Sequence, residues 1–214
     1  MTDSFIKKIE ERLQQPLPGQ AAQMKMAPHS RRGKMPIPDD VRLAGVMAAL
    51  FQKENAWHVI FIERNPNDKD QHGGQISFPG GKAEPEDGTM LQTALRETEE
   101  EVGILQNKIN VLGALSELYI PVSNFQVFPF VGYLDQQPVY KIQESEVSQV
   151  IETPLSHFAD PTFQKEKDIR INKYLTLKNV PYYEVEGKIL WGATAMMMSE
   201  LVDVIESSQK AQLL

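Results

Sequence analysis

The chain has 214 residues, a formal net charge of −7 and no cysteine. This length predicts one compact domain with room for a sizeable core, the acidic charge argues against binding to a nucleic-acid backbone, and the lack of cysteine excludes disulfides, thiolate zinc sites and cysteine nucleophiles. No apolar run approaches membrane-spanning length and the N-terminus lacks the plan of a signal peptide, so we expect a cytoplasmic protein without membrane contact.

The first forty residues are predicted to form a short helix and an irregular arm, which precede the main domain at residues 41–214. Apolar residues recur at helical spacing at Phe5, Ile6, Ile9 and Leu13. Residues 16–40 are instead rich in Pro, Gly, Gln, Met and basic residues. We expect this arm either to wrap the body or the partner subunit of a homodimer, or to be disordered.

The next segment predicts a β-hairpin. Residues 42–51 are apolar nearly throughout, as in a strand buried on both faces, and residues 57–63 alternate like a second strand. Lys53-Glu54-Asn55 predicts the turn between them. A polar loop at residues 64–77 then leads to Phe78-Pro79-Gly80-Gly81.

Residues 77–104 predict a strand end, a glycine turn, an acidic loop and a helix. The two glycines allow the backbone to pass close to a ligand. Asp87 or Thr89 can cap the helix, and Gly103 is its expected stop.

The helix has an apolar stripe and an acidic stripe. The residues predicted to face the core are Leu91, Leu95, Thr98 and Val102. Glu97, Glu100 and Glu101 stand at i, i+3 and i+4, so their like charges repel unless a divalent cation neutralises them. Arg96, four residues before Glu100, can hold one carboxylate. A solvated acidic face is the alternative, but the Gly-Gly turn, the arginine and the closing glycine together favour a site.

The remaining chain predicts strands at residues 109–120, 125–134, 169–177 and 180–190, the last broken at Glu186-Gly187. A closing helix begins at residues 191–195, Trp-Gly-Ala-Thr-Ala.

Residues 96–104, R-E-T-E-E-E-V-G-I, resemble the second half of the Nudix box, R-E-U-x-E-E-x-G-U, where U is a bulky or aliphatic residue. The first half departs from the common form, because Asp87 stands at the usual glutamate position and the gap from there to Arg96 is one residue longer. That longer gap, the F-P-G-G turn and the W-G-A-T-A phrase resemble the coenzyme A pyrophosphatase-like branch of the family.

The resemblance implies an α/β class protein with the Nudix fold, an α/β/α sandwich around a mixed β-sheet. It also implies that Glu97, Glu100, Glu101 and the carbonyl of Gly80 hold Mg²⁺ or Mn²⁺, with Arg96 orienting the carboxylates. The family's E-V-x-x-V-x-x-x-P-L segment is similar to residues 141–155, which makes Glu146 the loop acid, with Glu144 as the reserve. Glu97 or Glu146 is then the general base.

The implied reaction is hydrolysis of coenzyme A or acyl-CoA to adenosine 3′,5′-bisphosphate and (acyl-)4′-phosphopantetheine. An upstream motif of the coenzyme A branch is partly matched, which nominates five substrate-binding residues: Arg64, Lys69, His72, Gln75 and Phe78. Asn65 replaces a serine of that motif. Arg64 and Lys69 could equally be surface charges.

Two other functions stay open: a Nudix pyrophosphatase acting on ADP-ribose, NADH or dinucleoside polyphosphates, and a non-catalytic nucleotide sensor or scaffold.

Overall fold

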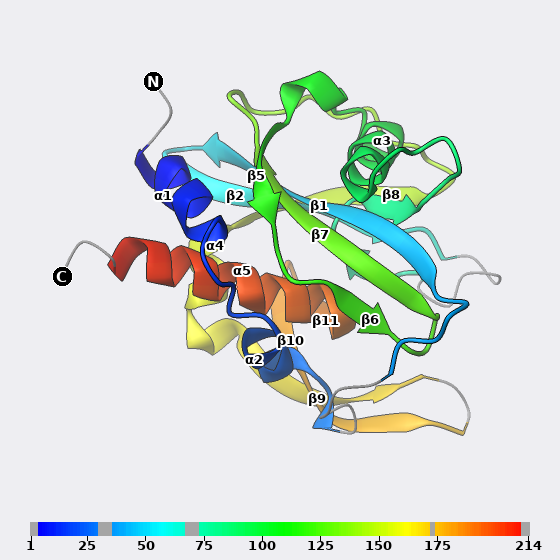
Figure 1. The fold of residues 1–214 in the computed structure, drawn as a ribbon. Coiled ribbons are helices and arrows are strands. Elements are labelled where there is room, and N and C mark those ends of the chain that lie inside the picture. The colour runs from blue at the N-terminus through cyan, green and yellow to red at the C-terminus, as the bar shows by residue number, and fades with distance from the viewer. Residues whose placement is uncertain (1–3, 30–35, 67–72, 172–173, 211–214) are drawn as a thin grey trace.

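The computed structural model describes residues 4–29, 36–66, 73–171 and 174–210 (Figure 1). In these residues, a mixed sheet of eight strands occupies the centre of the molecule. Its strands are β1 (Arg42–Lys53), β2 (Ala56–Arg64), β3 (Ile76–Ser77), β4 (Gly80–Lys82), β5 (Asn110–Ala114), β6 (Leu118–Ile120), β7 (Phe125–Tyr133) and β8 (Val147–Pro154). The order is β3-β2-β1-β7-β5, with β4 paired to β1, β6 to β7 and β8 to β2.

The predicted hairpin is confirmed in β1 and β2. The two strands pair antiparallel, and Glu54 and Asn55 form the turn with φ of 51° and 63°. On its other side β1 pairs parallel with β7, from Arg42 opposite Phe125 to Leu50 opposite Tyr133. Strand β1 is therefore central, which explains its nearly continuous apolar sequence.

Helices cover both faces of this sheet (Figure 1). Helix α3 (Met90–Val102), followed by the 3₁₀ turn η3 (Gln106–Lys108), lies on one face. The other face carries α1 (Ser4–Leu13), α2 (Gln20–Gln23), η1 (Met24–Met26), α4 (Leu155–Ala159), η4 (Pro161–Phe163) and α5 (Gly192–Lys210). Alternate residues of β1 divide between two cores, since Met47 and Phe51 pack under α3 while Ala48 and Leu50 pack with α1 and α5. The predicted α/β/α layering is confirmed.

A second, antiparallel sheet consists of β9 (Gln164–Arg170), β10 (Thr176–Val185) and β11 (Lys188–Trp191). The predicted break at Glu186-Gly187 is confirmed as the turn between β10 and β11. The strand predicted at residues 169–177 is wrong, because these residues span the connection between β9 and β10. The true strand β9, Q-K-E-K-D-I-R, buries only Ile169 and so has no apolar alternation to reveal it.

The N-terminal segment packs onto the main body. Residues of α1 and η1 belong to the same core as α5. The arm that the sequence predicts to be irregular contains α2 and η1, and Glu200 of α5 accepts hydrogen bonds from the backbone N–H of Gly19 (3.0 Å) and the side-chain amide of Gln23 (2.9 Å). Glu200 is fully buried and also accepts from the N–H of Ser116 (3.2 Å). Residues 19–27 thus wrap the body.

None of the helices in the described parts of the chain is both long and apolar enough to cross a membrane.

Candidate active site

Strand β4 carries the two glycines against β1, with Gly80 opposite Val46 and Gly81 opposite Gly45. Neither glycine has room for a side chain. A Cβ on Gly80 would lie 2.3 Å from the carbonyl oxygen of Gly45, and a Cβ on Gly81 would lie 2.4 Å from the carboxyl carbon of Glu97. The turn therefore brings bare backbone directly against a carboxylate of α3.

Helix α3 is fixed at both ends and against the sheet. Thr89 caps it by accepting a hydrogen bond from the N–H of Gln92, and Gly103 ends it in the left-handed conformation with φ of 74°. Both signals were predicted. The first turn rests on β1, because a Cβ on Gly45 would lie 2.4 Å from the carbonyl oxygen of Met90. The acidic stripe of α3 is therefore carried by a rigid element.

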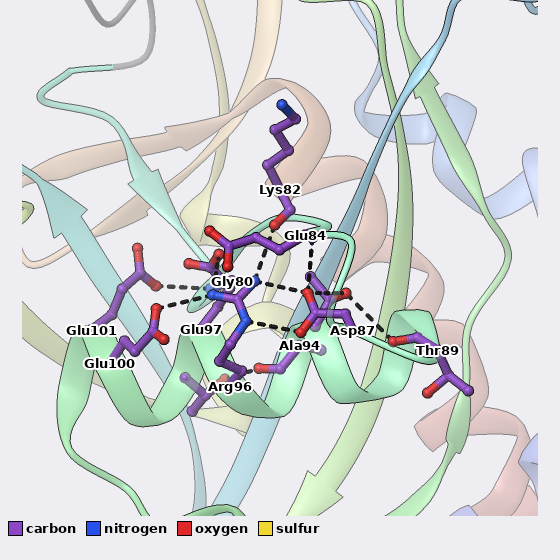
Figure 2. Close-up of polar contacts among 12 residues, drawn as sticks. Gly80, Lys82, Glu84, Asp87, Thr89, Ala94, Arg96, Glu97, Glu100 and Glu101 are labelled. Atoms are coloured by element: carbon purple, nitrogen blue, oxygen red, sulfur yellow. Dashed lines mark hydrogen bonds and ion pairs between the residues drawn. The ribbon is translucent and has the colours of Figure 1, made fainter.

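Arg96 is the centre of an ion-pair network, and Figure 2 shows its guanidinium between Asp87 and the glutamates. Its Nε and Nη2 donate to the two carboxylate oxygens of Asp87, each at 2.9 Å. Its Nη1 lies 2.9 Å from Glu97 and 3.0 Å from Glu100. The hydrogen bonds from Arg96 hold the pKa of Asp87 well below its usual range. The predicted contact of Arg96 with Glu100 is confirmed.

Glu101 is the most buried acid of the stripe, with a side chain that is 2% exposed. It accepts a hydrogen bond from the N–H of Gly80 at 2.8 Å and lies 3.7 Å from a guanidinium nitrogen of Arg64. Burial raises the pKa of Glu101 to about 8, assisted by the negative charges of Glu97 and Glu146 and opposed by Gly80 and Arg64. The protein thus places this carboxylate where its negative charge is poorly compensated.

Glu97 is also inside the site, with a side chain that is 15% exposed. Burial is the largest cause that raises its pKa, the charge of Arg96 lowers it, and the charges of Glu100 and Glu146 raise it. Glu100 differs from both, because its side chain is 57% exposed. The three acids share the predicted stripe but not the same depth.

Glu146 is exposed on the turn that precedes β8. Its charge acts on both Glu97 and Glu101. Its backbone carbonyl accepts a hydrogen bond from the N–H of Asn65 at 2.7 Å. Glu144, the reserve candidate, is on the same turn, and its carbonyl accepts a hydrogen bond from the side-chain amide of Asn65.

The residues predicted to bind substrate have different fates. Arg64 lies beside Glu101, as described above. Gln75 lies next to Arg64, because its carbonyl accepts a hydrogen bond from the N–H of Arg64 at 3.0 Å. Lys69 and His72 lie outside the described residues. Phe78 is 1% exposed and stacks on Phe61 at 5.0 Å, so its predicted contact with substrate is corrected to a role in the core.

The carboxylates do not converge as a finished ligand cluster. Within the described residues, no three His, Cys, Asp or Glu side chains are arranged to hold a metal ion. Glu97 and Glu100 engage Arg96, and Glu101 engages Gly80 and Arg64. The donor set nevertheless suits a hard divalent cation, because it consists of carboxylate oxygens whose crowding and burial raise the pKa of two of them.

Sequence reasoning missed the role of Asp87. Its carboxylate binds Arg96 and also accepts hydrogen bonds from the hydroxyl of Thr93 (2.9 Å) and the N–H of Glu84 (3.0 Å). It therefore joins the loop after β4 to the middle of α3. The available signal was an acid near the glutamate position of the motif, with the arginine nine residues later.

Comparison with known proteins gives consistent matches. The family model described as NUDIX domain matches residues 41–174. The chain is 32% identical over 154 residues to the "Uncharacterized Nudix hydrolase NudL" of Yersinia enterocolitica, covering 68% of this chain and 73% of that protein. It is 29% identical over 184 residues to the protein of that name from Photorhabdus laumondii, covering 86% and 94%. The solved structure of RenU, a Nudix hydrolase from M. smegmatis, superposes with a TM-score of 0.51 at 14% identity, covering 80% of this chain and 88% of that one.

Proposed function

We propose, from the premise that the chain belongs to the Nudix family and is a pyrophosphohydrolase acting on phosphoric anhydrides, that its substrate is coenzyme A or acyl-CoA. Nudix hydrolases act on nucleoside diphosphate-linked substrates, a class that includes coenzyme A. The proposed products are adenosine 3′,5′-bisphosphate and (acyl-)4′-phosphopantetheine.

One observation carries the chemistry of this proposal. Glu97 and Glu101 on α3 and Glu146 on the loop before β8 interact electrostatically beside the bare backbone of Gly80-Gly81. Carboxylates from two separate elements therefore act on one another beside this closely packed backbone. Such an arrangement can hold a cation and a phosphate together and deliver water to them.

The choice of coenzyme A is supported by residues of this chain that resemble one branch of the family. The longer gap between Asp87 and Arg96 contains the N-cap Thr89 and the first turns of α3. Asp87 spans it, because its carboxylate binds both the N–H of Glu84 in the preceding loop and the guanidinium of Arg96. Arg64, the first arginine of the upstream motif, lies 3.7 Å from Glu101 at the edge of the acidic stripe. A guanidinium there is suited to bind a substrate phosphate.

Nudix hydrolases generally use divalent metal ions, typically Mg²⁺ or Mn²⁺. We assign Glu97, Glu100, Glu101 and the carbonyl of Gly80 as the groups that would hold them. When bound, such an ion stabilises charge on the phosphate oxygens and makes a bound water more acidic. Arg96 contacts only one oxygen of each of these two carboxylates, Oε1 of Glu97 and Oε2 of Glu100, so their ion pairs are compatible with ligation through the second oxygen.

The protein's own groups then divide the remaining work. Arg96 keeps the stripe ordered, because its Nε and Nη2 are held by the two carboxylate oxygens of Asp87 while its Nη1 contacts the glutamates. Glu146 is the preferred general base, because its side chain is exposed on a loop and can reach water, whereas Glu97 is buried against Gly81 and held by Arg96. The base takes the proton of the attacking water, and Arg64 steadies the phosphate under attack.

The test is a substrate panel with product identification by mass spectrometry. Purified protein is incubated with Mg²⁺ or Mn²⁺ and coenzyme A, acetyl-CoA, ADP-ribose, NADH and a dinucleoside polyphosphate. The proposal expects the highest kcat/KM for a coenzyme A compound, with adenosine 3′,5′-bisphosphate as product. A clear preference for ADP-ribose, NADH or a dinucleoside polyphosphate would establish the alternative substrate class.

Two matched variants test the assignment of the acids. Glu101→Gln changes a carboxylate of the proposed metal site, and we expect a loss of activity of about 10²-fold or more. Glu99→Gln makes the same change on the same helix, where the side chain instead accepts a hydrogen bond from the N–H of Gln106 at 3.3 Å. Full activity of Glu101→Gln would refute the assignment, and full activity of Glu99→Gln is expected.

A further inference from the structure

The turn that carries Glu146 is held between two parts of the site. On one side, the N–H groups of Lys141 and Gln143 donate to the carbonyls of Val102 and Glu101, the last residues of α3, each at 3.0 Å. On the other side, the turn meets Asn65, the residue that follows β2. The position of Glu146 relative to the acids of α3 therefore depends on both attachments.

Asn65 contacts this turn twice. Its backbone N–H donates to the carbonyl of Glu146 at 2.7 Å, and its side-chain amide donates to the carbonyl of Glu144. Within the turn, the N–H groups of Glu146 and Val147 both donate to the carbonyl of Gln143, each at 2.9 Å. Because the side-chain amide of Asn65 binds a carbonyl within this turn, it restricts the orientation of the turn.

Asn65 is also adjacent to a residue of the acidic site. Arg64 pairs with Glu101, while its backbone N–H and carbonyl bind Gln75 and Gly74. The dipeptide Arg64-Asn65 thus contacts α3 through one side chain and the Glu146 turn through the other. We propose that Asn65 is a positioning residue, whose side-chain amide fixes the Glu144–Glu146 turn and so holds the carboxylate of Glu146 toward Glu97 and Glu101.

This inference rests on the proposed function, because it takes Glu146 to be the general base. It adds a residue at the position where the resembling motif has serine. A serine hydroxyl can also donate a hydrogen bond, but it lies one bond closer to the backbone, so the contact with Glu144 uses the longer reach of the asparagine amide. The role belongs to the catalytic step, since Asn65 acts on the base and Arg64 on the phosphate.

The experiment compares Asn65→Ala, Glu146→Gln, their double variant and the control Ser148→Ala. Asn65→Ala removes the side-chain amide but keeps the backbone N–H bond. Ser148 lies just beyond the turn, and its hydroxyl donates to the carbonyl of Glu63 at 3.1 Å, so its replacement also breaks one bond between β8 and β2. All four proteins are first checked by thermal unfolding to establish that they fold.

We expect Asn65→Ala to lower kcat about tenfold with KM nearly unchanged, and Glu146→Gln to lower kcat about 10²-fold. In the double variant the loss should equal that of Glu146→Gln alone, because Asn65 acts through Glu146. Ser148→Ala should keep both constants. Multiplicative losses in the double variant, unchanged kcat in Asn65→Ala, or full activity of Glu146→Gln would each overturn the proposal.

A second measurement does not involve catalysis. In protein without substrate or metal, hydrogen–deuterium exchange across residues 141–147 should be faster in Asn65→Ala than in the wild type, and unchanged in Ser148→Ala. Equal exchange in Asn65→Ala would also overturn the proposal. The kinetic comparison of the four variants uses whichever diphosphate the substrate panel identifies. If the assignment to coenzyme A is incorrect, the substrate panel shows this, and the test of Asn65 remains valid.

Discussion

Replacing Gly81 by alanine should separate catalysis from stability. Gly81 has no left-handed φ, so an alanine backbone is acceptable at this position. Its Cβ would however lie 2.4 Å from both the carboxyl carbon and Oε2 of Glu97. Since non-bonded carbon atoms settle at about 3.5 Å, the carboxylate must withdraw by about 1 Å.

The size of the effect follows from what has to move. The end of the Glu97 side chain can rotate away, so we expect the free energy of unfolding to change by no more than about 1 kcal/mol. A displacement of about 1 Å in a catalytic group costs about 10²-fold in rate. Urea denaturation measures the first quantity, and steady-state hydrolysis of the identified substrate measures kcat and KM.

Two other glycines provide the controls. Gly80→Ala would place its Cβ 2.3 Å from the carbonyl oxygen of Gly45 at a φ of 146°, so both backbone collision and strain should destabilise the protein by about 3 kcal/mol or more. In Gly88→Ala, the nearest atoms to the new Cβ belong to the flexible side chain of Gln92, with Oε1 at 2.7 Å, so this variant should keep both stability and activity. If Gly81→Ala retained wild-type kcat, the carboxylate of Glu97 would have no role that depends on its position.

Three further results are expected. Asp87→Asn should lower the free energy of unfolding by about 1–3 kcal/mol at pH 7, because the folded protein depresses the pKa of Asp87. This stabilisation is present above the ordinary aspartate pKa of about 4 and is lost as the pH falls below it toward the folded value. Urea denaturation should therefore give a smaller difference between the variant and the wild type at pH 3. Glu200→Gln should lower the free energy of unfolding by about 1–3 kcal/mol in the same assay, while kcat stays unchanged. The reason is that one of the N–H donors from Gly19, Gln23 and Ser116 loses its acceptor. An unchanged unfolding midpoint would show that these bonds do not hold the arm. Removal of divalent ions with EDTA should abolish hydrolysis, and added Mg²⁺ or Mn²⁺ should restore it; turnover that persists in excess EDTA would rule out the proposed metal site.

Much of the site was predictable because its signals are local. Thr89 and Gly103 set the ends of α3 through bonds within a few residues, and the angular spacing of an α-helix places Glu97, Glu100 and Glu101 on one stripe. Their different burial was not predictable. Glu101 is buried because Gly80 and Arg64 meet it from β4 and β2, while Glu100 projects to solvent, and that difference depends on tertiary packing.

Two other errors have the same origin. Phe78 belongs to a motif associated with substrate, but its ring fills the core beside Phe61, so the motif position reflects packing. Strand β9 lacked apolar alternation because its charged residues stay in water, and only pairing with β10 identifies it as a strand. Periodicity detects a strand only when one of its faces is buried.

The parallel pairing of β1 with β7 has a consequence for how the protein reaches its active form. Arg42 and Phe125 become neighbours only after the intervening chain, which contains α3 and the whole glycine turn, has been closed into a loop. Closing so long a segment is entropically unfavourable, and topologies of this kind fold slowly. During synthesis, the chain must therefore leave the ribosome through β7 before the central sheet can close, and through the turn at residues 144–146 before Glu146 can approach α3.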